Sequence, residues 1–377
     1  MAGIYIHIPF CKQKCNYCNF YSLASTRYMS EVTKAITDEL LQRKDYLKGL
    51  EVETIYFGGG TPSILATADI ESIVGTIYRN FRVNALAEIT LEANPDDLTP
   101  GKDESLKKAG INRLSIGIQS FRQDDLQFLS RSHSSGQVTQ CITDAQGAGF
   151  QNLSIDLIYG IPTLTDLGWE ENLEKAFSLG IPHISAYSLT VEAKTPLELM
   201  IRNGKTKPVE ENLSLSQYRI LTNLMQKYGY EHYEISNFCL PGAYSRHNTA
   251  YWLGKPYLGI GPSAHSYNGT SRQWNVANLK GYIESATAGS VSSELEILSP
   301  VTQLNEYIMT SLRTIWGCDL LVVKEKYGSG EAEKLLIDSL PFIEKEQMVY
   351  REGKLFITSE GRLFTDGISS ALFGEEE

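Results

Sequence analysis

The chain has 377 residues, of which 42% are hydrophobic and 21% charged, and its formal net charge is −11. These values are typical of a soluble globular protein with room for one large domain and a smaller one. The negative charge disfavours extended contact with nucleic acid, and no apolar run is long enough to predict a membrane-spanning helix.

Short apolar runs alternate with helical segments through residues 1–230. We predict strands at residues 4–8, 54–57, 88–92, 113–119, 152–158 and 183–189. Amphipathic helices are predicted near residues 29–40, 67–81, 99–109, 134–148, 164–178 and 210–227. Successive strand-helix units favour a parallel sheet, because each crossover returns the chain to the same end of the sheet. The units are too few for an eight-stranded barrel, so we expect an α/β fold with a partial (β/α)6 barrel.

Three cysteines with the spacing CxxxCxxC follow the first predicted strand: Cys11, Cys15 and Cys18, with Tyr17 before the third. Thiolates bind iron–sulfur clusters and zinc. Structural zinc usually takes four ligands from two separated pairs, and no second pair follows here. Three sulfurs on a four-iron cubane leave one iron free for a small molecule. The motif resembles that of the radical S-adenosylmethionine superfamily, which implies a 4Fe-4S cluster and S-adenosylmethionine; zinc and incidental cysteines are the alternatives.

The remaining cysteines, Cys141, Cys239 and Cys318, lie far apart in the sequence. Six cysteines in a chain of this length do not form a disulfide framework. The first residues also lack the basic and apolar segments of a secretion signal. A reducing compartment, the cytoplasm, is therefore expected.

Glycines and polar residues occupy the carboxyl ends of the later predicted strands, where parallel α/β folds bind their ligands. The second strand ends in the glycine-rich run 58–62, whose backbone can approach a ligand closely. Glu92, Gln119 and Asp156 lie at or near the ends of the next three strands, and Arg131 follows a short helical stretch. Any one of them alone would ordinarily be an exposed loop residue. As a set they suit the ammonium, ribose and adenine of a nucleoside, and Arg131 suits its carboxylate.

Three segments, at residues 5–11, 58–62 and 155–162, are similar to the oxygen-independent coproporphyrinogen III oxidase family and its relatives. The similarity extends over most of the chain and implies a radical S-adenosylmethionine barrel. By position, it implies ten contacts to S-adenosylmethionine. These are Tyr5, Tyr17, Gly59, Gly60, Thr61, Glu92, Gln119, Arg131, Asp156 and Thr190.

Residues 231–298 break the alternating pattern and are expected to close the open side of the barrel. They contain an HNxxYW motif formed by His247, Tyr251 and Trp252. The oxidase family carries a further cysteine two residues after the third ligand, where this chain has Phe20. Both features resemble the HemW branch of heme chaperones, which implies heme contacts by the three motif residues. Imidazole ligates heme iron and aromatic rings pack on a macrocycle, but a buried, hydrogen-bonded His247 is the alternative.

The last region, residues 299–377, is predicted to form a small α+β, winged-helix-like domain. Helices are expected at residues 304–316, 320–326 and 330–340, and strands at residues 348–350 and 354–357. The acidic charge of the chain favours a structural or partner-binding role for this domain over DNA binding.

The resemblance implies a heme chaperone that binds a 4Fe-4S cluster, S-adenosylmethionine and heme. Its partners would be acceptor hemoproteins such as respiratory enzymes, and an electron donor if the cluster is reduced. The competing hypothesis is a coproporphyrinogen III oxidase, which would use the same cofactors for radical decarboxylation; Phe20 speaks against it. Peripheral membrane contact and a homodimer are both compatible with the sequence.

Overall fold

The computed structural model describes residues 1–375, and its largest element is a sheet whose six central strands are parallel and follow the sequence order. These strands are β1 (Ala2–Ile8), β2 (Val52–Gly59), β3 (Val83–Ala93), β4 (Arg113–Gln119), β5 (Asn152–Tyr159) and β6 (His183–Ser188). All six lie where the sequence predicts them. The α/β class and the partial barrel are therefore confirmed.

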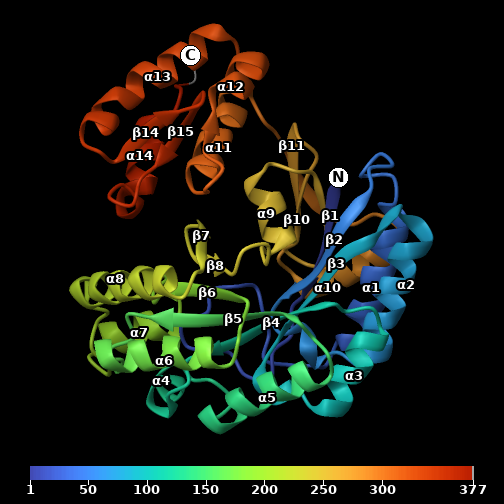
Figure 1. The fold of residues 1–377 in the computed structure, drawn as a ribbon. Helices are drawn as coiled ribbons and strands as arrows, with labels where there is room; N and C mark the ends of the chain where they lie inside the picture. Colours follow the sequence, from blue (N-terminus) through green and yellow to red (C-terminus); the bar gives the residue numbers. More distant parts are fainter. Residues whose placement is uncertain (376–377) are drawn as a thin grey trace.

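The crossover helices form an outer layer around the strands (Figure 1). They are α1 (Met29–Gln42), α2 (Thr67–Asn80), α3 (Pro100–Lys108), α5 (Ser135–Gly147), α6 (Asp166–Ser178) and α8 (Glu211–Lys227). Two short helices are also present. The first, α4 (Gln123–Phe128), is the short helical stretch expected before Arg131, and the second, α7 (Pro196–Arg202), was not predicted because it is too short to show a helical period. The longer helices bury one apolar face each, as the sequence pattern requires.

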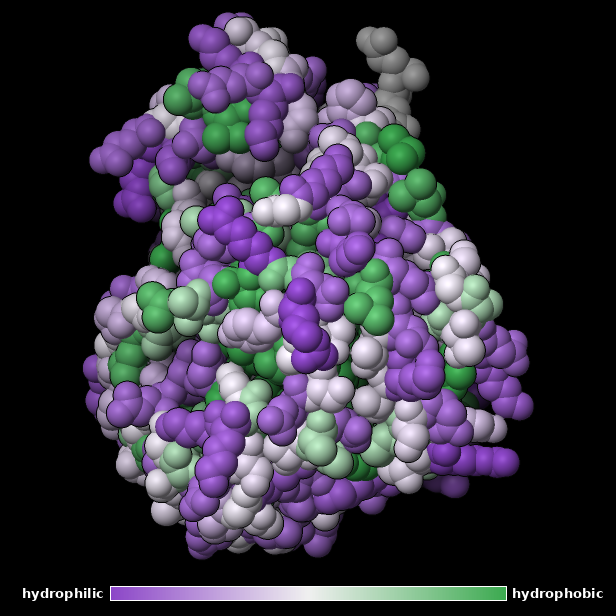
Figure 2. All heavy atoms as spheres, turned by 90° about the vertical axis from the view of Figure 1, so that its right-hand side faces the viewer, coloured by the Kyte–Doolittle hydropathy of each residue, from purple (hydrophilic) through white to green (hydrophobic). Residues whose placement is uncertain are grey.

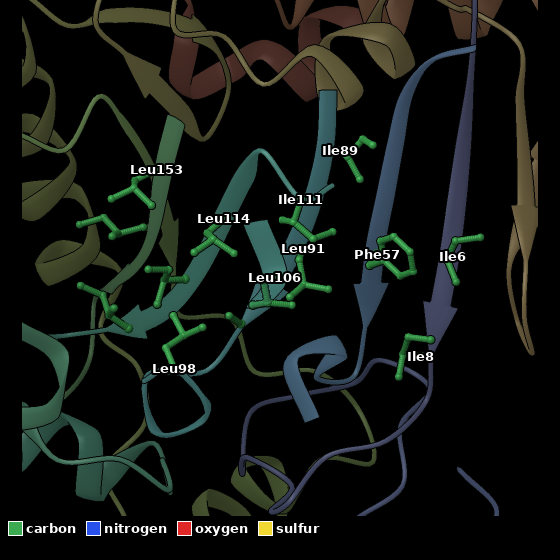
Figure 3. Close-up of a cluster of buried hydrophobic side chains, with 14 of the residues drawn as sticks. Ile6, Ile8, Phe57, Ile89, Leu91, Leu98, Leu106, Ile111, Leu114 and Leu153 are labelled. Atoms are coloured by element: carbon green, nitrogen blue, oxygen red, sulfur yellow. The ribbon is translucent and has the colours of Figure 1, made fainter. Parts of the chain in front are cut away.

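The outward face of the central sheet carries the hydrophobic core. Strand pairing places Ile6, Phe57, Leu91, Leu114 and Leu153 side by side in one row across β1 to β5, and all five are buried (Figure 3). Full burial stabilises each of these side chains by about 1.5–3 kcal/mol, so this row is a large part of what holds the helices on the sheet.

The inward face of the same strands is polar. The row next to the apolar one consists of Tyr5, Tyr56, Thr90 and Arg113, which are paired in register across β1 to β4. Successive residues of a strand point to opposite faces, so the alternating sequence separates the core from the barrel interior. The barrel interior is therefore lined with side chains that can form hydrogen bonds.

Residues 231–298 lengthen the sheet at both edges. At one edge β8 (Asn237–Cys239) and β7 (Glu231–Glu234) follow β6, and at the other β9 (Tyr257–Ile260), β10 (His265–Tyr267), β11 (Ser271–Asn275) and β12 (Ser293–Ile297) follow β1. Among the described residues the two end strands, β12 and β7, do not pair with each other. Strand pairing thus gives no support to the expectation that this region closes the barrel. It also contains α9 (Arg246–Trp252) and α10 (Leu279–Thr287).

The C-terminal region has a hydrophobic cluster of its own, which includes Leu304, Ile308, Val323 and Leu355. Its elements are α11 (Pro300–Leu312), β13 (Cys318–Asp319), α12 (Leu320–Tyr327), α13 (Ser329–Glu344), β14 (Met348–Arg351), β15 (Lys354–Ile357) and α14 (Thr365–Ala371). The strands form a separate sheet in the order β13-β15-β14, as in a winged-helix-like unit. The sequence did not predict β13 or α14, and residues 376–377 of the predicted domain lie outside the described part of the chain.

The C-terminal unit stands on one side of the barrel, near α8, β7 and β8 (Figure 1). On the face seen in Figure 2, hydrophobic residues are scattered among hydrophilic ones. Within residues 1–375 no helix has both the length and the apolar character needed to cross a bilayer.

Candidate functional site

The cysteine motif lies in the loop after β1 and lines a cavity of about 920 Å³ at the carboxyl ends of the strands. Cys11, Cys15 and Cys18 are all partly exposed there. The loop is fixed by contacts with later segments: Gln13 donates to the Ser130 carbonyl at 2.9 Å, and Lys12 forms an ion pair with Asp96 at 3.1 Å. These contacts anchor the loop to later segments of the chain, and the loop presents the three thiols to one cavity.

A four-iron cluster and a single metal ion place different demands on the three thiols. Across residues 1–375, no three His, Cys, Asp or Glu side chains are close enough together to hold one ion. A cubane needs only one cysteine for each of three irons, so separated thiols suit it, whereas zinc requires its ligands to converge. The remaining cysteines, Cys141, Cys239 and Cys318, are buried, and burial raises their pKa to about 12, which disfavours the thiolate form.

Arg131 contacts the cysteine loop directly. Its Nη1 donates to Cys15 Sγ at 3.2 Å and to the Tyr17 hydroxyl at 3.4 Å. Its Nη2 donates to Asn94 Oδ1 and to the Gly117 carbonyl, both at 2.6 Å. The sequence suggested that Arg131 pairs with a ligand carboxylate. In the structure its guanidinium contacts the thiol loop and the ends of β3 and β4, and its pairing with a ligand carboxylate stays a prediction.

The glycine-rich run after β2 packs against β1 where no side chain would fit. Gly59 has a φ of +109°, and a Cβ there would lie 2.6 Å from the His7 ring. A Cβ on Gly60 would lie 2.6 Å from the Phe10 carbonyl oxygen. The residues must therefore be glycine for the turn to form, and Gly59, Gly60 and Thr61 line the cavity beside the cysteine loop.

Two partly buried carboxyl groups, those of Glu92 and Asp156, line the cavity. Glu92 accepts hydrogen bonds from the Tyr56 hydroxyl at 2.9 Å and from the Gly59 amide at 3.1 Å. Burial, together with the nearby charge of Asp156, raises the pKa of Glu92 to about 7. Burial also raises the pKa of Asp156. A ligand that brings positive charge or hydroxyl groups would stabilise both groups as carboxylates.

Gln119 lies at a strained end of β4. Its φ is +65°, a left-handed conformation that is uncommon for residues other than glycine, and the pairing register of β4 with β5 shifts between Ile116 and Gln119. This irregularity directs the side chain into the cavity. Strain of this kind recurs at ligand sites, where the surrounding structure holds it in place.

The ten residues predicted to contact S-adenosylmethionine are almost all brought together. Nine line the cavity: Tyr17, Gly59, Gly60, Thr61, Glu92, Gln119, Arg131, Asp156 and Thr190. Tyr5 does not; it lies deeper in the barrel, and its hydroxyl is 3.2 Å from His7 Nδ1. Asn94, Ser115 and Gly117 also line the cavity and were missed, although Asn94 and Gly117 lie near the end of a predicted strand and Ser115 lies within one.

The HNxxYW motif is divided between two environments. His247 is 1% exposed, its Nδ1 is 2.7 Å from Thr54 Oγ1, and its Nε2 is 2.8 Å from the Tyr251 hydroxyl. Burial lowers its pKa to about 3. A heme iron could reach neither nitrogen without displacing a hydrogen bond, so this conformation gives no support to direct heme contact by His247 or Tyr251. Trp252 does line the cavity.

The far wall of the cavity comes from the C-terminal unit and was not foreseen. It includes Arg313, Arg362, Leu363 and Thr365. No motif marks these residues in the sequence, because their position depends on how the C-terminal unit packs against β7 and α8. Phe20, in the place of the oxidase cysteine, is 65% exposed and lines the same cavity from the cysteine loop.

Comparison with known proteins extends this description. Residues 5–182 match the model of the radical SAM superfamily. The heme chaperone HemW of Bacillus subtilis (strain 168) is 33% identical over 379 residues, which cover 100% of both chains. HemW of Lactococcus lactis subsp. lactis (strain IL1403) is 32% identical and covers 95% of this chain and 93% of its own. The structure of coproporphyrinogen III oxidase (HemN) from Escherichia coli superposes with a TM-score of 0.84 at 22% identity, over 99% of this chain and 90% of that one.

The thiol loop, the strand-end cavity and these similarities define a radical SAM protein, a class whose members bind a 4Fe-4S cluster and S-adenosylmethionine. The likeness to the oxidase establishes the fold alone. Within the superfamily the chain belongs to the HemW heme chaperone family.

Proposed function

We propose that this protein is a cytoplasmic heme chaperone, which binds heme and delivers it to acceptor hemoproteins such as respiratory enzymes. The observation that carries the proposal is the full-length similarity to proteins named heme chaperones, at 33% identity over 379 residues. Phe20 adds support, because the oxidase family has a cysteine at this place in the wall of the cavity.

In this proposal Cys11, Cys15 and Cys18 hold the 4Fe-4S cluster, and the cavity beside them holds S-adenosylmethionine. When bound, the cluster supplies an iron that the ligand can reach and, if reduced by an electron donor, an electron for cleavage of the sulfonium. The glycine backbone at residues 59–60 offers amide and carbonyl groups to the methionine part of the ligand.

Glu92, Gln119 and Asp156 supply the remaining polar contacts in this proposal. Glu92 in its carboxylate form suits the ligand ammonium, and Asp156 suits the ribose hydroxyls. Both groups are partly buried, and the low local dielectric that raises their pKa values also strengthens their contacts with a ligand. Ligand binding that favours one conformation of the cavity wall would in turn bias the binding of heme.

One experiment tests the function. Protein reconstituted without oxygen is given S-adenosylmethionine and reductant, then offered either hemin or coproporphyrinogen III. We expect stoichiometric hemin binding, transfer of hemin to an apo-hemoprotein, and no vinyl product from the porphyrinogen. Formation of the vinyl product would contradict the chaperone proposal and support the oxidase. An absence of hemin binding would contradict it as well.

A further inference from the structure

Part of the cavity wall that does not come from the cysteine loop combines cationic and apolar groups from separate elements. Arg313 follows α11 and Arg362 precedes α14, whereas Trp252 ends α9. A second cavity, of about 420 Å³, shares Arg313, Arg362 and three further residues with the first. The second cavity is lined by residues of α8, β7 and the C-terminal unit, so the space continues between the barrel and this unit.

Arg362 is partly buried and has no acidic partner among the described residues. Its Nη1 donates to His232 Nδ1, and its Nη2 lies 3.4 Å from the His232 carbonyl. His232 Nε2 is 3.1 Å from the Ile235 carbonyl, which assigns the ring hydrogen to Nε2 and leaves Nδ1 as the acceptor. Burial lowers the pKa of Arg362, because no carboxylate compensates its charge. A guanidinium held in this way is a binding site for an anion.

Arg313 provides a second positive charge on the same wall. Its Nε and Nη2 donate to Asp366 Oδ1 at 3.1 and 2.5 Å. The Asp366 side chain is 73% exposed, so this ion pair lies at the solvent edge and contributes little to stability. A ligand carboxylate can therefore share or replace Asp366 at small cost.

The rest of this wall suits a flat apolar body. Trp252, Tyr218, Ile235 and Leu363 line it, and no histidine lines the larger cavity among residues 1–375. Aromatic rings pack well on flat conjugated ligands. The whole chain carries a net charge of −11 and repels anions at long range, so an acidic ligand needs the local positive charge that these two arginines provide.

We propose that Arg362 and Arg313 bind the carboxylates of the porphyrin, with the macrocycle packed on Trp252 and Leu363 between the barrel and the C-terminal unit. This inference rests on the proposed heme chaperone function and specifies where the heme lies. It places the heme in the same cavity as the cysteine loop but on another part of the cavity wall.

The test is hemin titration of the reconstituted full chain, followed by absorbance, for wild type and for Arg362→Gln, Arg313→Gln and the double variant. Loss of a charge-assisted contact is expected to raise the Kd for hemin about 10- to 100-fold for each arginine. Arg362→Lys keeps the positive charge but lacks the planar guanidinium that can donate two parallel hydrogen bonds. Its affinity for hemin should therefore lie between those of wild type and Arg362→Gln. Arg202→Gln, an exposed arginine of α7 that lies outside the cavity, is the matched control and should bind hemin like wild type.

Hemin dimethyl ester, which has no free carboxylate, shows whether the two arginines act through the carboxylates of the porphyrin. The ester should bind wild type and the arginine variants equally, and all variants should keep wild-type iron content. Equal hemin affinity in wild type and the double variant would overturn the site and leave the chaperone function standing. A variant that loses ester binding as strongly as hemin binding would also overturn it. Wild type that binds no hemin would overturn the function together with the site.

Discussion

Ionisable side chains inside the barrel are held in protonation states that differ from those they take in water. Burial raises the pKa of Glu92 to about 7 and lowers that of His247 to about 3. Both lie on the polar inward side of the strands, yet they have different uses. Glu92 faces the cavity, whereas both nitrogens of His247 are occupied by protein partners.

Glu92 should make S-adenosylmethionine binding depend on pH. Its carboxylate form, which suits the ligand ammonium, predominates only above its pKa of about 7. The affinity is therefore expected to fall as the pH is lowered from 8 to 6, by up to about tenfold per unit below pH 7. Calorimetric titration across this range measures the effect. Glu92→Gln should bind weakly with a flat profile, and parallel profiles for the two proteins would contradict this role.

Asp103, in α3, should make the fold less stable at alkaline pH. Its side chain is fully buried, neither carboxyl oxygen has a hydrogen-bond partner in the described structure, and burial raises its pKa to about 7. A pKa above the unfolded value means that its favourable contribution is complete only at low pH and is lost as the pH rises through 7. Asp103→Asn should raise the free energy of unfolding at pH 8 by about 1–2 kcal/mol and change it little at about pH 4, near the unfolded pKa. Urea unfolding at both pH values tests this, and an equal effect at the two would contradict it.

Single substitutions of the six cysteines should fall into two groups of three according to the iron content of the variant protein. Cys11→Ala, Cys15→Ala and Cys18→Ala are each expected to abolish the cluster after anaerobic reconstitution. The matched controls are Cys141→Ala, Cys239→Ala and Cys318→Ala, whose thiols are buried away from the cavity and should leave iron content unchanged. Iron retained by any of the first three variants would remove that thiol from the ligand set.

At the scale of single elements, α9 shows how one motif can serve two purposes. His247 and Tyr251 are four residues apart and lie on one face, where they contact each other and β2. Trp252 lies on another face and lines the cavity. In this motif, His247 and Tyr251 therefore stabilise the barrel interior, and Trp252 contributes an aromatic side chain to the cavity wall.

Two substitutions in α9 should separate these purposes. His247→Ala leaves Thr54 and Tyr251 without their buried partner and is expected to lower the free energy of unfolding by about 1–3 kcal/mol. Trp252→Ala should change stability less and weaken hemin binding more. Urea unfolding and hemin titration of both variants provide the comparison. A strong loss of hemin affinity in a fully stable His247→Ala protein would restore direct contact by this residue.

The sequence was informative where a local pattern determines the structure. Short apolar runs between helical segments located all six central strands, and the ends of these strands located Glu92, Gln119 and Asp156. Short elements such as β13 and α14 leave no such period. Arg362 could not be found, because its place in the cavity wall is set by packing between distant segments. The same limit applies to His247, whose partner Thr54 lies 193 residues away.

For the whole molecule, one cavity extends from the cysteine loop to the C-terminal unit, so its ligands should influence each other. We expect S-adenosylmethionine to change the Kd for hemin by about tenfold, and hemin to change the Kd for S-adenosylmethionine by the same factor. Titration of each ligand in the presence and absence of the other measures both factors. Independent binding of the two would show that they do not share this space.

The two-sided central sheet has a consequence for how such a protein can diverge. Residues such as Phe57 and Leu114 pack the helices against the outward face of the sheet, whereas Glu92 and Ser115, which point to the other face, line the cavity. Substitutions of the residues that line the cavity change which ligand is bound and leave the hydrophobic core intact. The same fold can therefore support different functions. Proteins that carry a ligand and proteins that transform one can thus share this fold and differ in a few inward-facing side chains.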